Sequence, residues 1–75
     1  MSNKQPVVNA KELIKALRRK GFIFERQSGS HAIYINNENT RVIIPIHGKK
    51  DLAKGLLNQI LIDANITLDE LRDLI

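Results

Sequence analysis

The spacing of apolar residues changes along this chain, and these changes limit the folds that it can form. Apolar residues recur at helical spacing over residues 10–20, alternate in the short runs 22–27, 31–36 and 41–46, and return to helical spacing from residue 51. The 75 residues include no cysteine, so neither disulfides nor thiolate metal sites hold the fold together. Burial of the apolar faces must therefore stabilise one small domain.

The ends of the helices carry clear signals. Asn9 followed by Glu12 is a capping box that predicts the start of the first helix, and Gly21 is suited to end it. A second capping box, Thr67 with Glu70, predicts a short third helix that runs to the C-terminus. Between them we expect a long helix over residues 51–64, opened by Asp51 or a neighbour.

The three alternating runs predict an antiparallel sheet, with turns at residues 28–30 and 37–40. Pro45 cannot donate to a strand ladder, so the third strand is expected to lie at an edge or to end there. We expect the pairing that keeps the apolar residues on one face: Ile35 with Val42, Ile33 with Ile44, and His31 with Ile46.

The expected class is α+β: a helix, a three-stranded antiparallel sheet, a helix and a short C-terminal helix. Residues 1–8 read as a flexible lead-in, and residues 9–75 as a single domain. The chain shows neither a signal peptide nor an apolar run long enough to span a membrane, which favours a cytoplasmic protein.

Charge is unevenly distributed. The formal net charge is +4, and residues 1–50 hold ten of the twelve Lys and Arg but three of the eight Asp and Glu. We therefore expect a polyanion such as RNA to meet the first two thirds of the chain.

His31 is the candidate catalytic residue. Histidine exchanges protons near neutral pH, and the preceding Gly29 and Ser30 leave space and offer backbone N–H groups to an anion. An imidazole base that removes a ribose 2′-OH proton would cleave RNA but not DNA, with no metal or cofactor. Ser30 is a poor nucleophile beside it, because neighbours on a strand point to opposite faces. A solvated or hydrogen-bonded structural histidine remains the alternative.

Two basic clusters could contact RNA. Lys49, Lys50 and Lys54 flank the start of the second long helix, where backbone N–H groups also favour phosphate. A second cluster, Lys15, Arg18, Arg19 and Lys20, lies in the last turns of the first helix. Either cluster could instead be a solvated part of a helix. Tyr34 is either a base-stacking platform or an ordinary strand residue. His47 is either a second catalyst or a loop residue, and the expected register places it away from the face of His31.

A series of motifs follows the chain in this order: Gly21-Phe22, Arg26, Gly29-Ser30-His31, Tyr34, Pro45-Ile46-His47, Gly55 and Ile60. With these motifs the chain resembles the HicA toxins, small mRNA interferases of type II toxin–antitoxin systems, over roughly residues 9–74. The resemblance implies a fold like that of double-stranded-RNA-binding domains and an endoribonuclease in which His31 is catalytic; the absence of a metal-ligand set beside His31 predicts that it is metal-independent. It also implies mRNA and a cognate HicB antitoxin as partners, with oligomers formed mainly through the antitoxin complex.

The chain departs from the family pattern where basic residues or threonine are common, at Ser28, Leu56, Asn58 and Asp63. The changes in the second long helix weaken the case for RNA contact along its outer side. The expected RNA-binding residues are Gly29, Ser30, Arg26, Lys49, Lys50, Lys54, Arg19 and Lys20. Two alternatives stay open: a non-catalytic RNA-binding module with a structural His31, and a small regulatory protein whose ligand is another protein.

Overall fold

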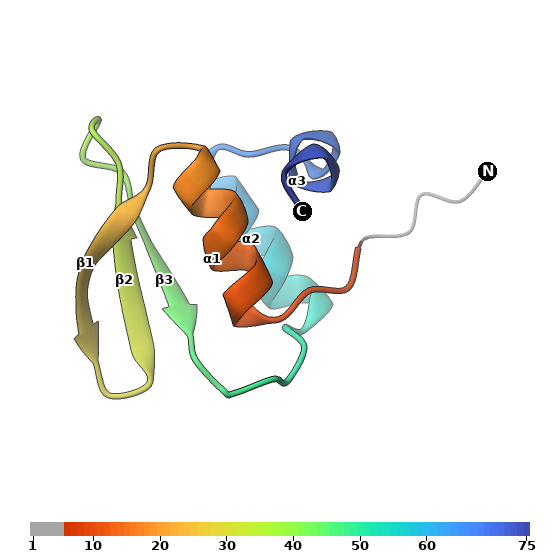
Figure 1. The fold of residues 1–75 in the computed structure, drawn as a ribbon, viewed down its shortest axis with the longest axis horizontal. Coiled ribbons are helices and arrows are strands. Elements are labelled where there is room, and N and C mark those ends of the chain that lie inside the picture. Colours follow the sequence, from red (N-terminus) through yellow and green to blue (C-terminus); the bar gives the residue numbers. More distant parts are fainter. Residues whose placement is uncertain (1–5) are drawn as a thin grey trace.

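The computed structural model describes residues 6–75 and has the predicted α+β architecture, similar to a double-stranded-RNA-binding domain (Figure 1). α1 and α2 lie on one side of the sheet, and α3 lies beside α1 on the side away from the sheet (Figure 1). The elements in order are α1 (Ala10–Arg19), β1 (Ile23–Ser28), β2 (His31–Ile35), β3 (Arg41–Pro45), α2 (Lys54–Ala64) and α3 (Leu68–Leu74).

Both predicted capping boxes are present. Asn9 Oδ1 accepts from the Glu12 N–H at 2.9 Å, and Glu12 Oε1 accepts from the Asn9 N–H at 3.0 Å. Thr67 and Glu70 make the equivalent reciprocal pair at α3. Gly21 follows α1 with φ +95°, a left-handed conformation that glycine adopts without strain. Local side-chain chemistry therefore defines both ends of α1 and the start of α3.

α2 begins later than the sequence predicts. It starts at Lys54, after an extended Ala53, whereas Asp51 forms an isolated β-bridge with Asn9. Next to this bridge the Leu52 N–H donates to the carbonyl of Val8 at 2.9 Å, and Val8 is only 1% exposed. Val8 thus belongs to the core and not to a flexible lead-in. Residues 1–5 of the expected lead-in lie outside the described residues.

The sheet has the order β1-β2-β3, with both pairs antiparallel, so β3 lies at an edge and ends at Pro45 as predicted. The predicted register between β2 and β3 is wrong by one residue. Tyr34 pairs with Val42 and Ala32 with Ile44, and His31 lies opposite Pro45 rather than Ile46.

The hairpin between β2 and β3 explains the different register. Thr40 is not part of the turn: its carbonyl accepts from the Asn36 N–H at 3.1 Å, which leaves a three-residue loop. Asn39 adopts φ +65°, the left-handed conformation that closes such loops. Asn36 Oδ1 accepts from the N–H groups of both Glu38 and Thr40, each at 2.9 Å. These bonds hold the shorter loop and the register that follows from it.

The two faces of the sheet differ as the register requires. Ala32, Tyr34, Val42 and Ile44 face the helices and pack with them in one core. Tyr34 is 8% exposed, and its ring meets that of Phe24 edge to face at 5.7 Å between centroids. Tyr34 is therefore a cross-strand core residue, and the base-stacking role is wrong. The opposite face carries His31, Ile33, Ile35 and Ile43, and no helix of residues 6–75 lies over it (Figure 1).

Two neighbouring isoleucines in β3 provide a matched test of this packing. Ile44 is 0% exposed and Ile43 is 56% exposed. We expect Ile44→Val to lower the free energy of unfolding by about 0.5–1.5 kcal/mol, because it removes a buried methyl group. Ile43→Val should change it by less than about 0.5 kcal/mol. Urea denaturation measures both, and equal losses would contradict the assigned faces.

Candidate active site

The turn between β1 and β2 places His31. Ser28 pairs with His31 across a two-residue loop, Gly29 and Ser30. Gly29 has φ +59°, whereas Ser30 has no positive φ, the pattern of a type II′ hairpin turn with glycine at its first central position. The Gln27 side-chain amide donates to the Gly29 carbonyl at 3.0 Å and braces the loop. His31 is therefore fixed as the first residue of β2, with its side chain exposed.

Arg26 and Ser28 share the face of His31. His31 and Ile33 lie two apart on β2, so their side chains point to the same, uncovered face. Their partners on β1 are Ser28 and Arg26, which places these two side chains on that face as well. The structure thus brings together an imidazole, a hydroxyl and a guanidinium beside the turn at Gly29 and Ser30.

The end of β3 lies on the other side of His31 from β1. Pro45 lies opposite His31, and the Ile46 N–H donates to the Ser30 carbonyl at 2.6 Å. The chain then turns, with the Lys50 N–H donating to the His47 carbonyl at 3.2 Å. Lys49 and Lys50 are exposed in this turn, and Lys54 follows as the first residue of α2. Of the two predicted basic clusters, the one formed by the lysines after β3 therefore lies at the end of the sheet that carries His31.

Arg19 and Lys20 lie at the other end of the sheet. Arg19 donates to the carbonyl of Leu74 at 3.3 Å, and Lys20 pairs with Glu70 at 2.7 Å. Both contacts join the C-terminal end of α1 to α3, close to where β1 begins (Figure 1). The structure does not bring Arg19 and Lys20 to His31, and their contact with RNA stays a prediction.

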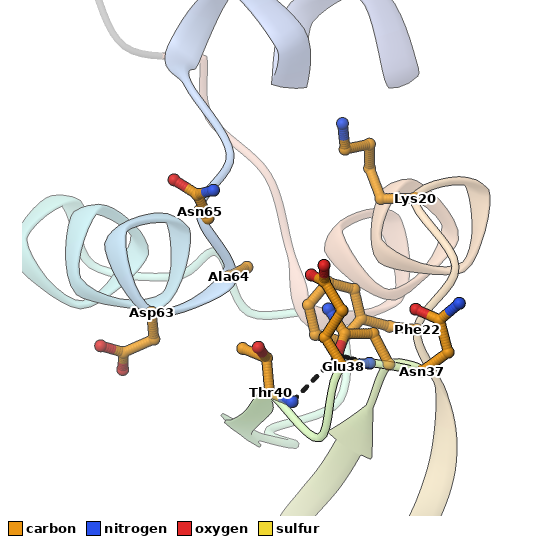
Figure 2. Close-up of a pocket in the computed structure, with 9 residues that line it drawn as sticks. Lys20, Phe22, Asn37, Glu38, Thr40, Asp63, Ala64 and Asn65 are labelled. Carbon is orange, nitrogen blue, oxygen red and sulfur yellow. Dashed lines mark hydrogen bonds between the residues drawn. The ribbon is translucent and has the colours of Figure 1, made fainter.

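A pocket at that far end carries mixed charges (Figure 2). It lies between the β2–β3 hairpin and the C-terminal ends of α1 and α2, with Lys20 on one side and the carboxylates of Glu38 and Asp63 on others. The C-terminal ends of helices and carboxylates both repel phosphate. This pocket is therefore unsuited to an RNA backbone, in contrast to the end that carries His31.

Glu25 and Arg41 form an ion pair across the uncovered face that the sequence did not reveal. Arg41 donates from Nε and Nη2 to the two carboxylate oxygens of Glu25 at 2.9 and 3.0 Å. The pair joins β1 to β3 over the intervening strand, at a point where the register of β1 shifts. The hydrogen bonds from Arg41 lower the pKa of Glu25, and those to Glu25 raise the pKa of Arg41. No local sequence signal marks this pair, because its members are 16 residues apart.

Replacing Glu25 should make stability less sensitive to acid. Because the folded-state pKa of Glu25 is lowered, the pair stabilises the fold above the unfolded-state pKa and ceases to do so as pH falls through the folded-state pKa. We expect Glu25→Gln to be slightly less stable than the parent at pH 7 and equal to it near pH 2. High salt should reduce the difference, because both side chains are near solvent. Thermal unfolding across pH measures this, and a constant difference would contradict it.

Two further properties hold for residues 6–75. Within this range no three His, Cys, Asp or Glu side chains are grouped so that they could hold a metal ion. Over the same range, the helices are too short or too polar to cross a membrane.

With this geometry in place, comparison with known families identifies the class of protein. Residues 10–66 match the family described as HicA toxin of bacterial toxin-antitoxin. The chain belongs to this family, because the match covers most of its length and includes α1, the whole sheet and α2. It is thus a toxin of a toxin–antitoxin system, and the toxins of this family are ribonucleases. Membership of the family implies that the toxin has a cognate antitoxin. A comparison with curated proteins found no match.

Proposed function

We propose that this toxin is an endoribonuclease that cleaves single-stranded mRNA with His31 as its catalytic base. The observation that carries the proposal is the exposed His31 on the uncovered face of the sheet, beside Arg26 and the turn at Gly29 and Ser30. An exposed strand face admits an extended nucleic acid, and a guanidinium on the same face as the imidazole suits a phosphodiester.

The proposed reaction begins at a ribose. His31 removes the 2′-OH proton, the 2′ oxygen attacks the adjacent phosphorus, and the bond from phosphorus to the 5′ oxygen breaks. The products are a 2′,3′-cyclic phosphate and a 5′-hydroxyl, and the 5′ oxygen takes up one proton. Arg26 and the backbone N–H groups of the turn offset the charge on the phosphate oxygens. The steps require neither a metal nor a cofactor.

Removing the imidazole should separate chemistry from binding. We expect His31→Ala to slow cleavage by about 10²–10⁴-fold, the usual contribution of a general base, with RNA affinity within a few-fold of the parent. Gel analysis of an end-labelled RNA measures cleavage, and fluorescence anisotropy measures binding.

Two controls address the substrate and the metal. The parent toxin should leave an all-deoxy strand intact and should keep its activity in EDTA. Cleavage of the DNA strand, or loss of activity in EDTA, would contradict the mechanism. If the parent toxin binds RNA but does not cleave it, the chain is a non-catalytic RNA-binding module.

The lysines after β3 should supply part of the RNA affinity. Lys49 and Lys50 are exposed at the His31 end of the sheet. We expect Lys49→Ala with Lys50→Ala to weaken binding and to lower the log–log salt slope by about 0.7 for each lost phosphate contact. The double change Arg19→Ala, Lys20→Ala, at the other end, shows whether the RNA path also reaches α1. An unchanged slope after the first double change would show that Lys49 and Lys50 lie in a solvated turn and do not contact phosphate.

The cognate antitoxin, a HicB-type protein, is proposed to cover the same face of the sheet. Ile23 and Ile43 are exposed large apolar side chains, Arg26 lies among them, and an acidic partner with an apolar contact surface would match both properties. Such a partner would block His31 directly and would account for larger assemblies formed through the antitoxin. Because the proposed substrate is mRNA, we expect this regulation to take place in the cytoplasm.

Competition between RNA and the antitoxin tests this arrangement. We expect Arg26→Glu to weaken both partners, and His31→Ala to retain antitoxin binding, since one imidazole is a small part of an interface of about 800 Å² per partner. Titration of antitoxin into toxin bound to labelled, uncleavable RNA should release the RNA. A stable ternary complex with undiminished RNA affinity would show that inhibition does not act by covering this face.

A further inference from the structure

His47 belongs to the same end of the sheet as His31 but comes from a different strand. Pro45 lies opposite His31, and the bond from the Ile46 N–H to the Ser30 carbonyl continues the ladder one residue beyond β3. His47 is the next residue. It follows Pro45, the partner of His31, by two residues, at the point where the chain turns away from the sheet.

The neighbours of His47 indicate the side to which it points. Ile46 is half-buried and packs against the core, so the next side chain points away from the core. His47 is exposed and lines a shallow pocket together with Pro45, the residue opposite His31. Lys50 and Asp51 are the charged residues of that pocket. An imidazole and an ammonium group thus stand beside the residue that faces the proposed base.

The proposed reaction needs a second proton transfer, which the base cannot supply in the same step. As the phosphorus–oxygen bond breaks, the 5′ oxygen becomes an alkoxide, a poor leaving group unless it is protonated. The 2′ and 5′ oxygens lie on opposite sides of the phosphorus in an in-line displacement. The base and the acid must therefore stand on opposite sides of the phosphate, and two histidines from different strands at one end of the sheet meet this requirement.

We propose that His47 is the general acid of this reaction. His31 takes the proton of the 2′-OH, the 2′ oxygen bonds to phosphorus, and the 5′ oxygen leaves with a proton from His47. Proton exchange with water then returns both imidazoles to their starting states. Lys50, in the same pocket, contacts a non-bridging phosphate oxygen. This assignment rests on the proposed ribonuclease function and adds a second catalytic residue to it.

The test uses two forms of one RNA linkage. An oligonucleotide with a single ribonucleotide carries either the normal 5′ oxygen or a 5′-bridging sulfur at the scissile phosphate. A thiolate leaves without protonation, so loss of a general acid matters little for the sulfur form. We expect His47→Ala to cleave the oxygen form about 10²–10⁴-fold more slowly than the parent and the sulfur form at nearly the parental rate. His31→Ala should lose activity on both.

His47→Gln serves as the second variant, because it keeps a polar side chain at this exposed position, and it should show the same selective loss. Circular dichroism and urea denaturation of both variants check the fold. Parental cleavage of the oxygen form by both His47 variants would overturn the inference but leave the proposed function intact. Equal losses on both forms would also overturn it, because they would indicate a binding or structural role. If the parent toxin cleaves neither form, the proposed function fails, and the general acid with it.

Discussion

A single apolar layer between the sheet and the two long helices supports every other feature of the molecule. Leu13 and Leu17 of α1, Ile44 of β3 and Leu57 of α2 are fully buried in it, and Val8 joins it from the segment before α1. Without cysteine, burial of this layer is the main source of stability. Because α1 and α2 both pack on one face of the sheet, the other face is left uncovered, and His31 lies on that face.

The sequence predicted those parts of the fold that local chemistry decides. Capping boxes, a glycine with positive φ and a proline at an edge act within a few residues, so their signals can be read directly. The register of β2 could not be read in this way, because both faces of this strand carry large apolar or aromatic side chains. Periodicity then gives no preference, and a loop one residue shorter than expected, closed by Asn36 and Asn39, decides the register.

The candidate site was predictable only where its residues are close in sequence. Gly29, Ser30 and His31 form one turn, and their chemistry is visible in the sequence. Arg19 and Lys20 are closer in sequence to His31 than Lys49 is, yet they lie farther away in space. β1 begins beside them and leads to the other end of the sheet, where the turn to His31 lies. Its six residues span about 20 Å at the usual rise of a strand. The direction of the chain, which sequence separation does not convey, therefore decides which basic residues lie at the end that carries His31.

The uneven distribution of charge along the sequence becomes a difference between the two ends of the sheet. At the hairpin end, Glu70 from the acidic C-terminal third pairs with Lys20, and Glu38 and Asp63 line the adjacent pocket. At the other end, Arg26 and the lysines after β3 lie near the histidine, with Asp51 as an acidic neighbour. Arg26, Lys49 and Lys50 therefore add positive charge at the end that carries His31. A polyanion is attracted there before any specific contact forms, so the overall electrostatics and the proposed chemistry favour the same end of the sheet.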